Sequence, residues 1–393
     1  MPVLSPRPVS AIRRFLNGQS SSGIVLMAAA AIALLIANSP LRHAYEHLLH
    51  AGIGPFSVGH MVNDGLMAIF FLLVGLEIKR EMLDGQLSSW PRRILPGIAA
   101  LGGMLFPAII YLAFNHHGVT NGWAIPTATD IAFALAVITL VGDRVPASLR
   151  VFLAALAIID DLGAVVIIAL FYTSGVSVFD LAGAALTLAV LIGFNRFKVR
   201  ALAPYLLVGV ILWLFVWRSG IHATIAGVLL ALTIPMRRTP ARSDHDHRDS
   251  PLHRLEHRLH APVGFLILPL FGLANAGVPV LGLPAGALLS PVTLGVGLGL
   301  LAGKVAGVFG MTSLAVRLGL ADRPAHAGQG QLFGMALLCG IGFTMSIFIT
   351  LLAFPTDPLL QAEAKIGVLM GSILSGVLGY AVLRRAGREG EAR

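Results

Sequence analysis

Apolar runs of about 20 residues, separated by short polar breaks, recur along almost the whole chain. A helix of that length crosses a hydrocarbon layer about 30 Å thick. Strands of a membrane barrel would be about 10 residues long and would alternate in polarity, which these runs do not. Only 12% of the 393 residues are charged, against roughly 25% in a soluble domain. The sequence therefore predicts an all-α integral membrane protein.

Twelve spans fit the runs best, in a single polytopic membrane domain over residues 1–393. They are predicted at residues 20–38, 59–84, 95–115, 121–142, 148–173, 178–195, 203–217, 220–236, 258–283, 289–315, 330–353 and 359–383. The lone Cys339 lies in an apolar run and forms neither an internal disulfide nor a metal motif.

The basic residues predict the orientation in the membrane. The net charge of +9 is spread over the ends of the apolar runs rather than gathered on one polar face, which argues against a nucleic-acid partner. Turns after even-numbered spans are rich in Arg and Lys, whereas turns after odd-numbered spans hold little beyond Arg42 and Arg218. The positive-inside rule then places the even turns and both termini in the cytoplasm. A hydrophilic, histidine-rich cytoplasmic loop is expected at 237–257, with a helix starting at Ser250 and Pro251.

Two spans contain helix-breaking segments. Span four carries Pro126 within residues 124–130, and span eleven carries Gly340 and Gly342 within residues 340–346. A broken helix inside a membrane survives only where protein or water satisfies its freed backbone groups, and paired broken spans mark a transporter site. Because the two spans are an odd number apart, residues 95–173 and 289–383 could form an inverted-topology repeat.

Four ionisable residues lie at similar depth inside the predicted membrane domain: Asp130, Asp160, Asp161 and Lys304. A charge at mid-bilayer costs at least about 2.5–3.5 kcal/mol, so each needs a compensating role. Adjacent helical residues point about 100° apart, so the two neighbouring aspartates cannot share one partner. One division pairs Asp160 with Lys304 and leaves Asp161 facing a water-filled funnel.

Such a site could exchange a cation for protons. Small hard cations prefer oxygen ligands, which Asp160, Asp161 and the Thr129 hydroxyl could supply. Paired carboxylates in a low-dielectric site hold protons more strongly, so that protons and cation compete. Alternatives remain open for the other groups: Asp130 could merely compensate helix ends, Lys304 could be a fixed charge or a proton carrier, and Thr129 could be a helix cap.

A second charged cluster is expected at the cytoplasmic surface, where span two ends and span nine begins. It could report cytoplasmic pH through its histidines, or could be a stripe of anchoring charges. Its members are Glu77, Arg80, Glu81, Glu256, His257 and His260.

Four ordered segments resemble the NhaA family of sodium/proton antiporters, for which inverted repeats with broken helices are an established architecture. These segments are residues 70–81, 126–134, 157–163 and 339–348, and the resemblance spans nearly the whole chain. It implies an electrogenic Na⁺(Li⁺)/H⁺ antiporter of a bacterial inner membrane, activated by rising pH, with no enzymatic activity and no cofactor.

The resemblance also assigns roles to residues. It implies cation and proton binding by Asp160 and Asp161, with Na⁺ or Li⁺ as the metal, and functional roles for Asp130 and Lys304. It favours the pH-sensing interpretation of the surface cluster, and it also implies a role in the pH response for His222.

The family often forms a homodimer through an outer β-hairpin between spans one and two. Residues 43–60 have weak strand alternation and contain Gly52 and Gly54, so the sequence gives no clear hairpin signal there.

Two other classes compete with the antiporter. A major-facilitator carrier would have its long loop between spans six and seven, where this chain has a short one. An intramembrane aspartyl protease would need aspartates on two facing helices, usually with a Gly-x-Gly-Asp element that this chain lacks.

Overall fold

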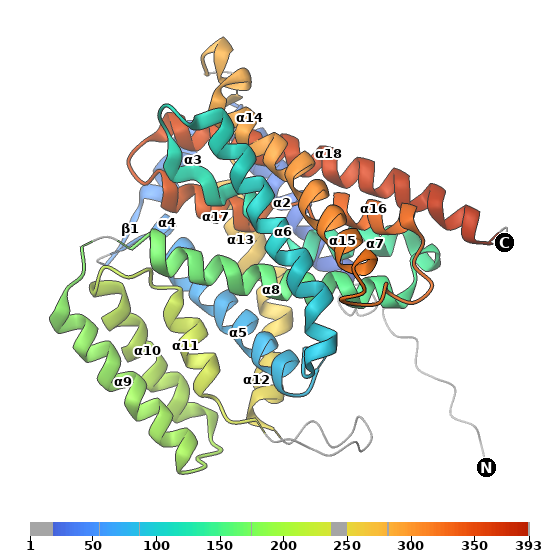
Figure 1. Ribbon diagram of the computed structural model, residues 1–393. Coiled ribbons are helices and arrows are strands. Elements are labelled where there is room, and N and C mark those ends of the chain that lie inside the picture. Colours follow the sequence, from blue (N-terminus) through green and yellow to red (C-terminus); the bar gives the residue numbers. More distant parts are fainter. Residues whose placement is uncertain are drawn as a thin grey trace, which may run out of the picture.

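The computed structural model describes residues 19–54, 56–85, 87–173, 175–236, 250–280 and 283–391. In these residues a helical segment stands at each of the twelve predicted spans (Figure 1). The unbroken ones are α2 (Gln19–Ala37), α5 (Met67–Leu83), α6 (Trp90–Asn115), α8 (Ala147–Phe171), α9 (Val178–Arg196), α10 (Leu202–Arg218), α11 (Ile225–Thr233) and α18 (Pro358–Glu391).

Not every segment is long enough to cross a bilayer by itself. Within the described part of the chain, eight helices are long and apolar enough to cross a membrane. The number rises to as many as ten if each of two bent helix pairs counts as one span. Predicted spans seven and eight are the short helices α10 and α11, of 17 and nine residues. The predicted all-α membrane fold is confirmed, while the number of complete crossings depends on how such short and bent segments are counted.

Predicted span nine is shifted along the chain. It runs over α12 (Pro251–Pro262), a π-helical turn and α13 (Leu268–Asn275), rather than over 258–283. Ser250 is the extended N-cap residue and Pro251 takes the first turn, as predicted, so the last part of the 237–257 loop is helical. Residues 237–249 of that loop lie outside the described residues.

Local sequence explains several helix starts. Ser177 accepts a hydrogen bond from the backbone N–H of Asp180 at the start of α9. Ser290 does the same for Thr293 at the start of α14 (Pro291–Leu298), where Pro291 occupies the first position. A side-chain oxygen at the N-cap satisfies a helix N–H that otherwise has no partner, and proline there loses no hydrogen bond.

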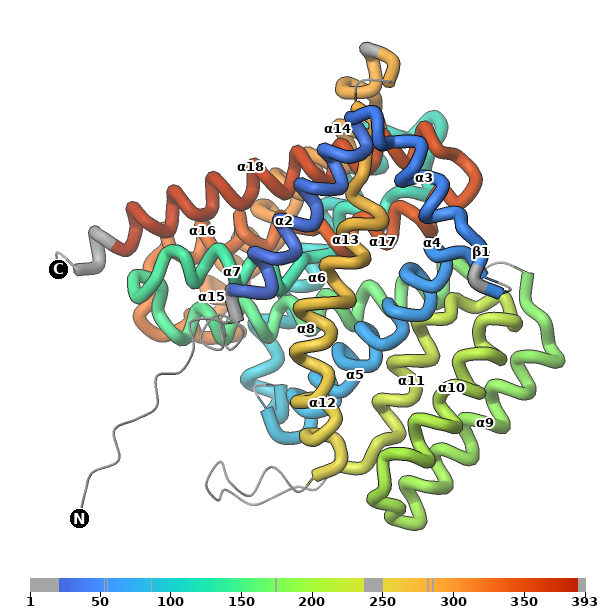
Figure 2. The backbone as a smooth tube through the Cα atoms, turned by 180° about the vertical axis from the view of Figure 1, so that it is seen from behind, coloured from blue at the N-terminus to red at the C-terminus, as the bar shows by residue number. Residues whose placement is uncertain are grey.

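The helices pack in two groups (Figures 1 and 2). Helices α9, α10 and α11 lie side by side at one flank, and their apolar core includes residues of α5 and α12. The remaining helices form the larger group, whose two cores meet on either side of α8. Helix α5 contributes residues to a core of each group and therefore lies between them, whereas α8 joins the two cores of the larger group.

Both predicted broken spans are discontinuous. Predicted span four consists of the 3₁₀ helix η2 (Thr120–Thr127), three extended residues, and α7 (Ile131–Val141). Predicted span eleven consists of α16 (Gln329–Leu338), four non-helical residues and α17 (Phe343–Ala353), with a bend of 42° between the helices. The breaks fall at Ala128–Asp130 and at 339–342, as Pro126 and the two glycines predict.

A small hairpin lies between the first two spans. Strand β1 (Gly52–Ile53) pairs antiparallel with β2 (Phe56–Ser57) in the register Gly52 with Ser57 and Ile53 with Phe56. Gly54, with φ of +63°, takes the left-handed conformation in the turn. Each strand has only two residues. A strand this short cannot show a pattern of alternating polar and apolar residues, which explains why no hairpin signal is visible in the sequence. The preceding α3 (Arg42–His50) bends by 114° from α2 and so does not extend that span.

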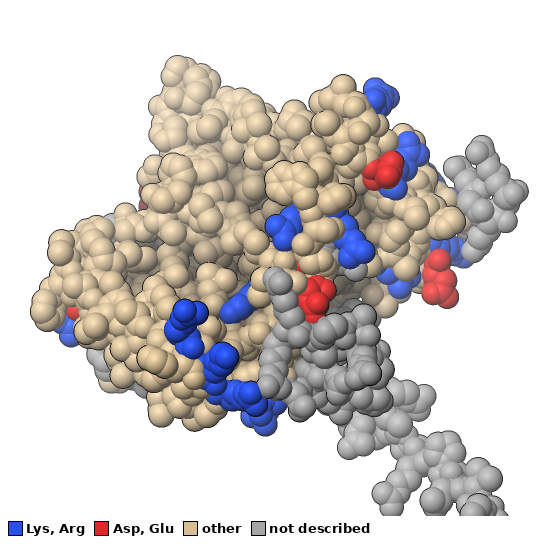
Figure 3. All heavy atoms as spheres, turned by 60° about the horizontal axis from the view of Figure 1, so that its bottom comes forward, with Lys and Arg blue, Asp and Glu red and all other residues tan. Residues whose placement is uncertain are grey.

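Lys and Arg side chains collect on one face of the molecule (Figure 3). This is the lower end in Figure 1, where α5 ends and α12 begins. The turn that follows α5 leads directly to Arg92 and Arg93 at the start of α6.

Candidate ion-binding site

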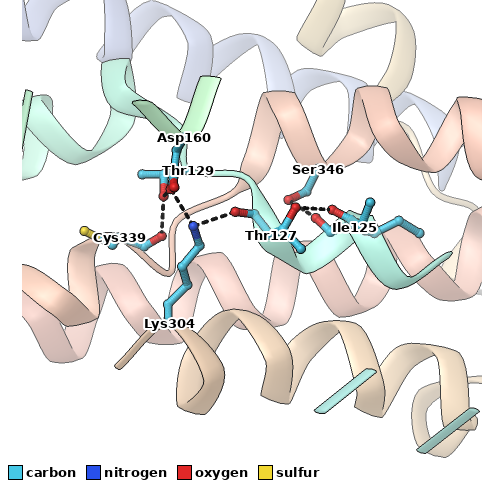
Figure 4. Close-up of polar contacts among 8 residues, drawn as sticks. Ile125, Thr127, Thr129, Asp160, Lys304, Cys339 and Ser346 are labelled. Atoms are coloured by element: carbon cyan, nitrogen blue, oxygen red, sulfur yellow. Dashed lines mark hydrogen bonds and ion pairs between the residues drawn. The ribbon is translucent and has the colours of Figure 1, made fainter. Parts of the chain in front are cut away.

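The two broken spans meet at their breaks. The backbone N–H of Asp130 donates to the Ile341 carbonyl at 2.6 Å, and the Thr129 hydroxyl donates to the Cys339 carbonyl at 3.0 Å. Beyond the crossing, the Ser346 hydroxyl donates to the Ile125 carbonyl at 2.7 Å (Figure 4). Each break thus satisfies backbone groups of the other, which is how irregular backbone persists inside a membrane protein.

Asp130 bridges the N-terminal ends of both half-helices. One carboxylate oxygen accepts from the backbone N–H of Phe133 in α7 at 3.1 Å. The other accepts from the backbone N–H and the hydroxyl of Thr344 in α17, at 3.0 and 2.6 Å. A negative charge is stabilised at the positive end of a helix dipole, and here two such ends share one carboxylate.

Replacing Asp130 with Ala is expected to destabilise the crossing. Loss of one N-cap costs about 0.5–2 kcal/mol, so losing two lowers the free energy of unfolding by about 1–4 kcal/mol. Thermal melting of the detergent-solubilised protein measures this. Asp143→Ala is the matched control, because that side chain is exposed in the turn after α7. Equal melting of the two variants would contradict the double-cap interpretation.

Lys304 reaches the crossing from the tenth predicted span. It lies between two π-helical turns, η8 (Gly299–Gly303) and η9 (Val305–Phe309). Its ammonium group is fully buried, donates to the Thr127 carbonyl at 2.6 Å and pairs with Asp160 Oδ2 at 2.6 Å (Figure 4). The ammonium therefore meets the carbonyl end of η2, while Asp130 meets the amide ends of α7 and α17.

Close glycine packing brings Lys304 to this position. A Cβ atom on Gly102 of α6 would stand 2.5 Å from the Gly307 carbonyl oxygen, and one on Gly307 would stand 2.1 Å from the Gly102 carbonyl oxygen. Neither residue can carry a side chain without moving a backbone. This contact holds the helix segment that carries Lys304, which lies about one helical turn before Gly307.

Gly307→Ala should therefore separate α6 from η9 and misplace Lys304. We expect overpacking to cost about 1–3 kcal/mol of stability, with a marked loss of ion exchange in membrane vesicles. Gly310→Ala is the control, since a Cβ at Gly310 meets no atom within 4 Å. Normal stability and transport in Gly307→Ala would refute the packing argument.

Asp160 and Asp161 have different surroundings, because adjacent residues of α8 point in different directions. Asp160 is 1% exposed, and its Oδ2 accepts from both Lys304 and the Thr129 hydroxyl, the latter at 2.7 Å. Asp161 is 4% exposed, and its buried Oδ1 accepts no hydrogen bond. The second oxygen of Asp160 is likewise buried without a partner. Unpaired buried carboxylate oxygens are costly, and a bound cation or proton would satisfy them.

Asp161 lines a cavity of about 170 Å³ that extends toward the basic end of the molecule. The same cavity is lined by Thr129 and Asp130 from the crossing and by Glu77 and His260 from the surface cluster. It corresponds to the funnel predicted from the sequence. A larger cavity of about 600 Å³ is lined by residues of α3, of the start of the second span and of α13, α17 and α18, and it shares no lining residue with the first.

Three aromatic residues pack together at the wall of the larger cavity, and we refer to them as the aromatic barrier. Phe348 of α17 lines that cavity and packs on Phe71 and Phe271, with ring centroids 5.6 and 6.2 Å away. All three side chains are buried. In the described part of the chain, the cavity beside Asp161 and this larger cavity have no lining residue in common, and the packed rings border the larger one.

The structure assembles most of the predicted surface cluster. Arg80 pairs with Glu256 at 2.9 Å and with Glu81 at 2.6 Å, and His260 Nε2 lies 3.2 Å from Glu77 Oε1. These contacts join the end of α5 to α12. His257, by contrast, is exposed on α12 outside these contacts.

His222 lies apart from this cluster. It lines the larger cavity at the opposite end, where its Nε2 is 3.7 Å from Asp64 and its ring stacks edge-on against Phe348 at 5.2 Å. Any pH response through His222 would act on that side of the aromatic barrier.

Several contributors to the site had no individual signal in the sequence. Thr344 lay inside a noted motif, but its bond to Asp130 depends on how the two breaks cross. The glycine contact between Gly102 and Gly307 also depends on tertiary packing. The π-helical turns beside Lys304 have no simple sequence pattern, although the cluster of glycines around that residue is suggestive of close packing.

Crossed discontinuous helices, a buried Asp–Lys pair and a second carboxylate on a cavity that reaches the crossing define an ion-coupled secondary transporter of the membrane. Comparison with known proteins agrees. The chain belongs to the Na⁺/H⁺ antiporter 1 family, whose model matches residues 13–383.

Bacterial proteins named Na(+)/H(+) antiporter NhaA are similar to this chain over nearly its whole length. The Mesorhizobium japonicum protein is 61% identical over 391 residues, covering 99% of this chain and 98% of its own. The Rhizobium etli protein is 61% identical over 376 residues, with 95% of each chain covered. Among solved structures, the sodium proton antiporter MjNhaP1 from Methanocaldococcus jannaschii matches with a TM-score of 0.50 and 16% identity, covering 94% and 92% of the chains. That likeness supports the fold.

Proposed function

We infer that this protein is a Na⁺/H⁺ antiporter that uses the aspartates at the helix crossing as its ion site. Membership of the antiporter family gives the exchange reaction. The single observation that carries the site is the position of Asp161, a buried carboxylate with an unpaired oxygen on the cavity that reaches the crossing.

The mechanism rests on competition at one site. A protonated Asp161 cannot bind a cation. The ionised carboxylate can bind either Na⁺ or a proton, but not both at once. Asp160 and the Thr129 hydroxyl add oxygen ligands, and Na⁺ as a hard cation prefers such groups. Asp160 is held by Lys304 in the absence of a cation, so binding must loosen that pair or use the free Oδ1. Li⁺ fits the same ligand chemistry.

Lys304 and Asp130 are proposed to neutralise the helix ends at the crossing, with Lys304 also able to release a proton when Asp160 engages the cation. If a second proton leaves in this way, each cycle moves net charge. The rival protease chemistry has no support at this site, because Asp160 faces an ammonium group rather than a second aspartate.

The orientation follows from the basic face. With that face in the cytoplasm of a bacterial cell, both termini lie inside and the cavity beside Asp161 opens inward. We call the cavity beside Asp161 the inner cavity. Exchange then requires the aromatic barrier of Phe71, Phe271 and Phe348 to open while the inner cavity closes. Rocking of the proposed repeats 95–173 and 289–383 around the crossing would achieve this. We also propose that two copies of the chain pair through the hairpin of β1 and β2.

The cluster of Glu77, Arg80, Glu81, Glu256 and His260 is proposed as the pH sensor. At low pH, protonated His260 attracts Glu77 and holds α5 against α12 at the cavity mouth. Rising pH removes that charge within the range over which histidines titrate, about pH 5–8, and frees the entrance.

His260→Gln should shift the pH–activity profile toward lower pH, because glutamine cannot carry the charge that holds the contact at low pH. A partly exposed ion pair is worth about 0–1 kcal/mol, and one pH unit corresponds to about 1.4 kcal/mol, so the shift should be under about one unit. The activity of vesicles measured from pH 6 to 9 tests this, with His257→Gln as the control on the same helix. A shift toward higher pH in His260→Gln would contradict the proposal.

The function is tested in everted vesicles from cells that lack their own Na⁺/H⁺ antiporters. The vesicles are energised to acidify the lumen, and a pH-sensitive dye is followed as Na⁺, Li⁺ or K⁺ is added at several pH values. Dequenching by Na⁺ and Li⁺ but not by K⁺, rising with pH, is the expected result. The absence of any response with the protein present in the membrane would reject the function.

A further inference from the structure

Two carboxylates and a histidine converge at the mouth of the inner cavity. Glu77 of α5 and Glu256 and His260 of α12 each place a ligand atom within 4.8 Å of the other two. Glu256 and His260 are four residues apart, so they lie on the same face of α12. Two ligands at this spacing on a helix, completed by a third from a neighbouring element, are a recurring way to chelate zinc.

The distances suit a small transition-metal ion. Zinc binds histidine nitrogen at about 2.0–2.1 Å and carboxylate oxygen at about 2.0–2.2 Å, so two tetrahedral ligands lie about 3.4 Å apart. His260 Nε2 and Glu77 Oε1 are 3.2 Å apart. A metal ion can therefore replace the hydrogen between them with little movement, while the Glu256 carboxylate has to swing inward.

Glu256 provides an independent sign of an unfilled ligand position. Its side chain is about nine-tenths buried, and Arg80 holds only Oε1. The other oxygen, Oε2, is buried and accepts no hydrogen bond. An unpaired carboxylate oxygen at this depth is costly, and a cation bound beside it removes the cost.

The local charge favours a cation and the ligand types favour a transition metal. Glu77, Glu81 and Glu256 outnumber Arg80, the cation that pairs with two of them. Arg80 orients Glu256 as an outer partner of a metal ligand would. Magnesium and calcium seek oxygen ligands only, whereas zinc and cobalt also accept imidazole nitrogen.

We propose that Glu77, Glu256 and His260 form a binding site for Zn²⁺ or a similar divalent transition metal, and that the bound ion blocks the inner cavity. Glu77 and His260 line that cavity together with Asp161, so a doubly charged ion between them obstructs and repels incoming Na⁺. It also ties α5 to α12. The blocking step rests on the proposed function, whereas metal binding does not.

Binding is tested on the purified full-length protein without a polyhistidine tag, by calorimetric titration with Zn²⁺. The chain has 13 histidines, and His245 and His247 stand two residues apart in the histidine-rich 237–257 segment, where they could also bind metal. All variants are therefore made in a background with these two changed to Gln. One Zn²⁺ should bind per chain. Affinity should fall at least about tenfold in Glu77→Gln and in His260→Gln, because loss of an outer hydrogen-bond partner of a ligand alone typically costs about 10–100-fold. His257→Gln, exposed on the same helix, should keep the parent affinity. Equal affinity in all variants would overturn the site.

A second measurement identifies the ligand directly. His260→Cys with Co²⁺ should produce a near-ultraviolet thiolate-to-cobalt absorption band, which the parent should lack although it contains the buried Cys339. Unchanged melting temperature in this variant excludes misfolding. Cobalt bound without the band would place the metal elsewhere and overturn the assignment.

Blocking is tested in everted vesicles, where the proposed cytoplasmic face points outward. Micromolar Zn²⁺ should suppress Na⁺-driven dequenching in the parent and in His257→Gln, and the fraction inhibited should fall sharply in His260→Gln. Zinc binding at the triad with full antiport would overturn the blocking role. Absence of antiport without zinc would instead reject the proposed function, and leave the binding test intact.

Discussion

Asp161→Asn is expected to abolish Na⁺/H⁺ exchange, reducing the dye signal in everted vesicles to that of vesicles without the protein. Asparagine has nearly the same shape and keeps one carbonyl oxygen, but it can neither ionise nor carry a proton. The parent carboxylate is 4% exposed on the inner cavity and has an unpaired buried oxygen. Removing its charge therefore removes both the attraction for Na⁺ and the proton exchanged for it.

Asp322→Asn is the matched control, because Asp322 is exposed in the turn between α15 (Gly310–Arg317) and α16. It should transport like the parent. Both variants should melt at nearly the parent temperature, since Asp161 accepts no hydrogen bond at Oδ1 that the substitution would break. Substantial exchange by Asp161→Asn would show that the competing carboxylate lies elsewhere.

Lys304→Met is expected to be the most destabilising single change at the site. It keeps an unbranched apolar side chain that is one heavy atom shorter, and it leaves Asp160 buried without its ammonium partner. Breaking one side of a buried ion pair costs about 3–5 kcal/mol, because the remaining charge is uncompensated. The Thr127 carbonyl at the end of η2 also loses its donor. Thermal melting in detergent measures the loss.

The double variant Asp160→Asn/Lys304→Met separates this pair from general damage. With both charges gone, the penalty of an unpaired charge disappears, so the double variant should be more stable than the sum of the single effects predicts. Residues in contact typically couple by about 0.5–3 kcal/mol, and this pair should fall at the upper end. Strictly additive effects would mean that Lys304 and Asp160 do not pair in the membrane.

Much of the site could be predicted because the membrane makes each charge and each helix break expensive. Pro126 and the glycines at 340 and 342 located both breaks, and the turn of a helix separated the roles of Asp160 and Asp161. The Asp160–Lys304 pair is present as expected. These inferences needed only local sequence and the cost of burying polar groups.

What the sequence did not predict depends on packing between distant segments. The bridge from Asp130 to Thr344 exists because two breaks cross at one depth, and the contact of Gly102 with Gly307 because two helices touch there. The family resemblance implied a role for His222 in the pH response but not its location, which is beside Asp64 on the larger cavity. Two-residue strands such as β1 and β2 are too short to leave an alternating pattern.

The central claim is that Na⁺ and protons compete for the carboxylates at the crossing, and proton release tests it most directly. Na⁺, Li⁺ or K⁺ is added to the purified protein in weakly buffered detergent solution at a pH where it is active, and the change in pH is recorded. The account predicts that Na⁺ and Li⁺ release protons while K⁺ does not, and that Asp161→Asn releases none. Saturable Na⁺ binding without proton release, or the same release from Asp161→Asn, would contradict it.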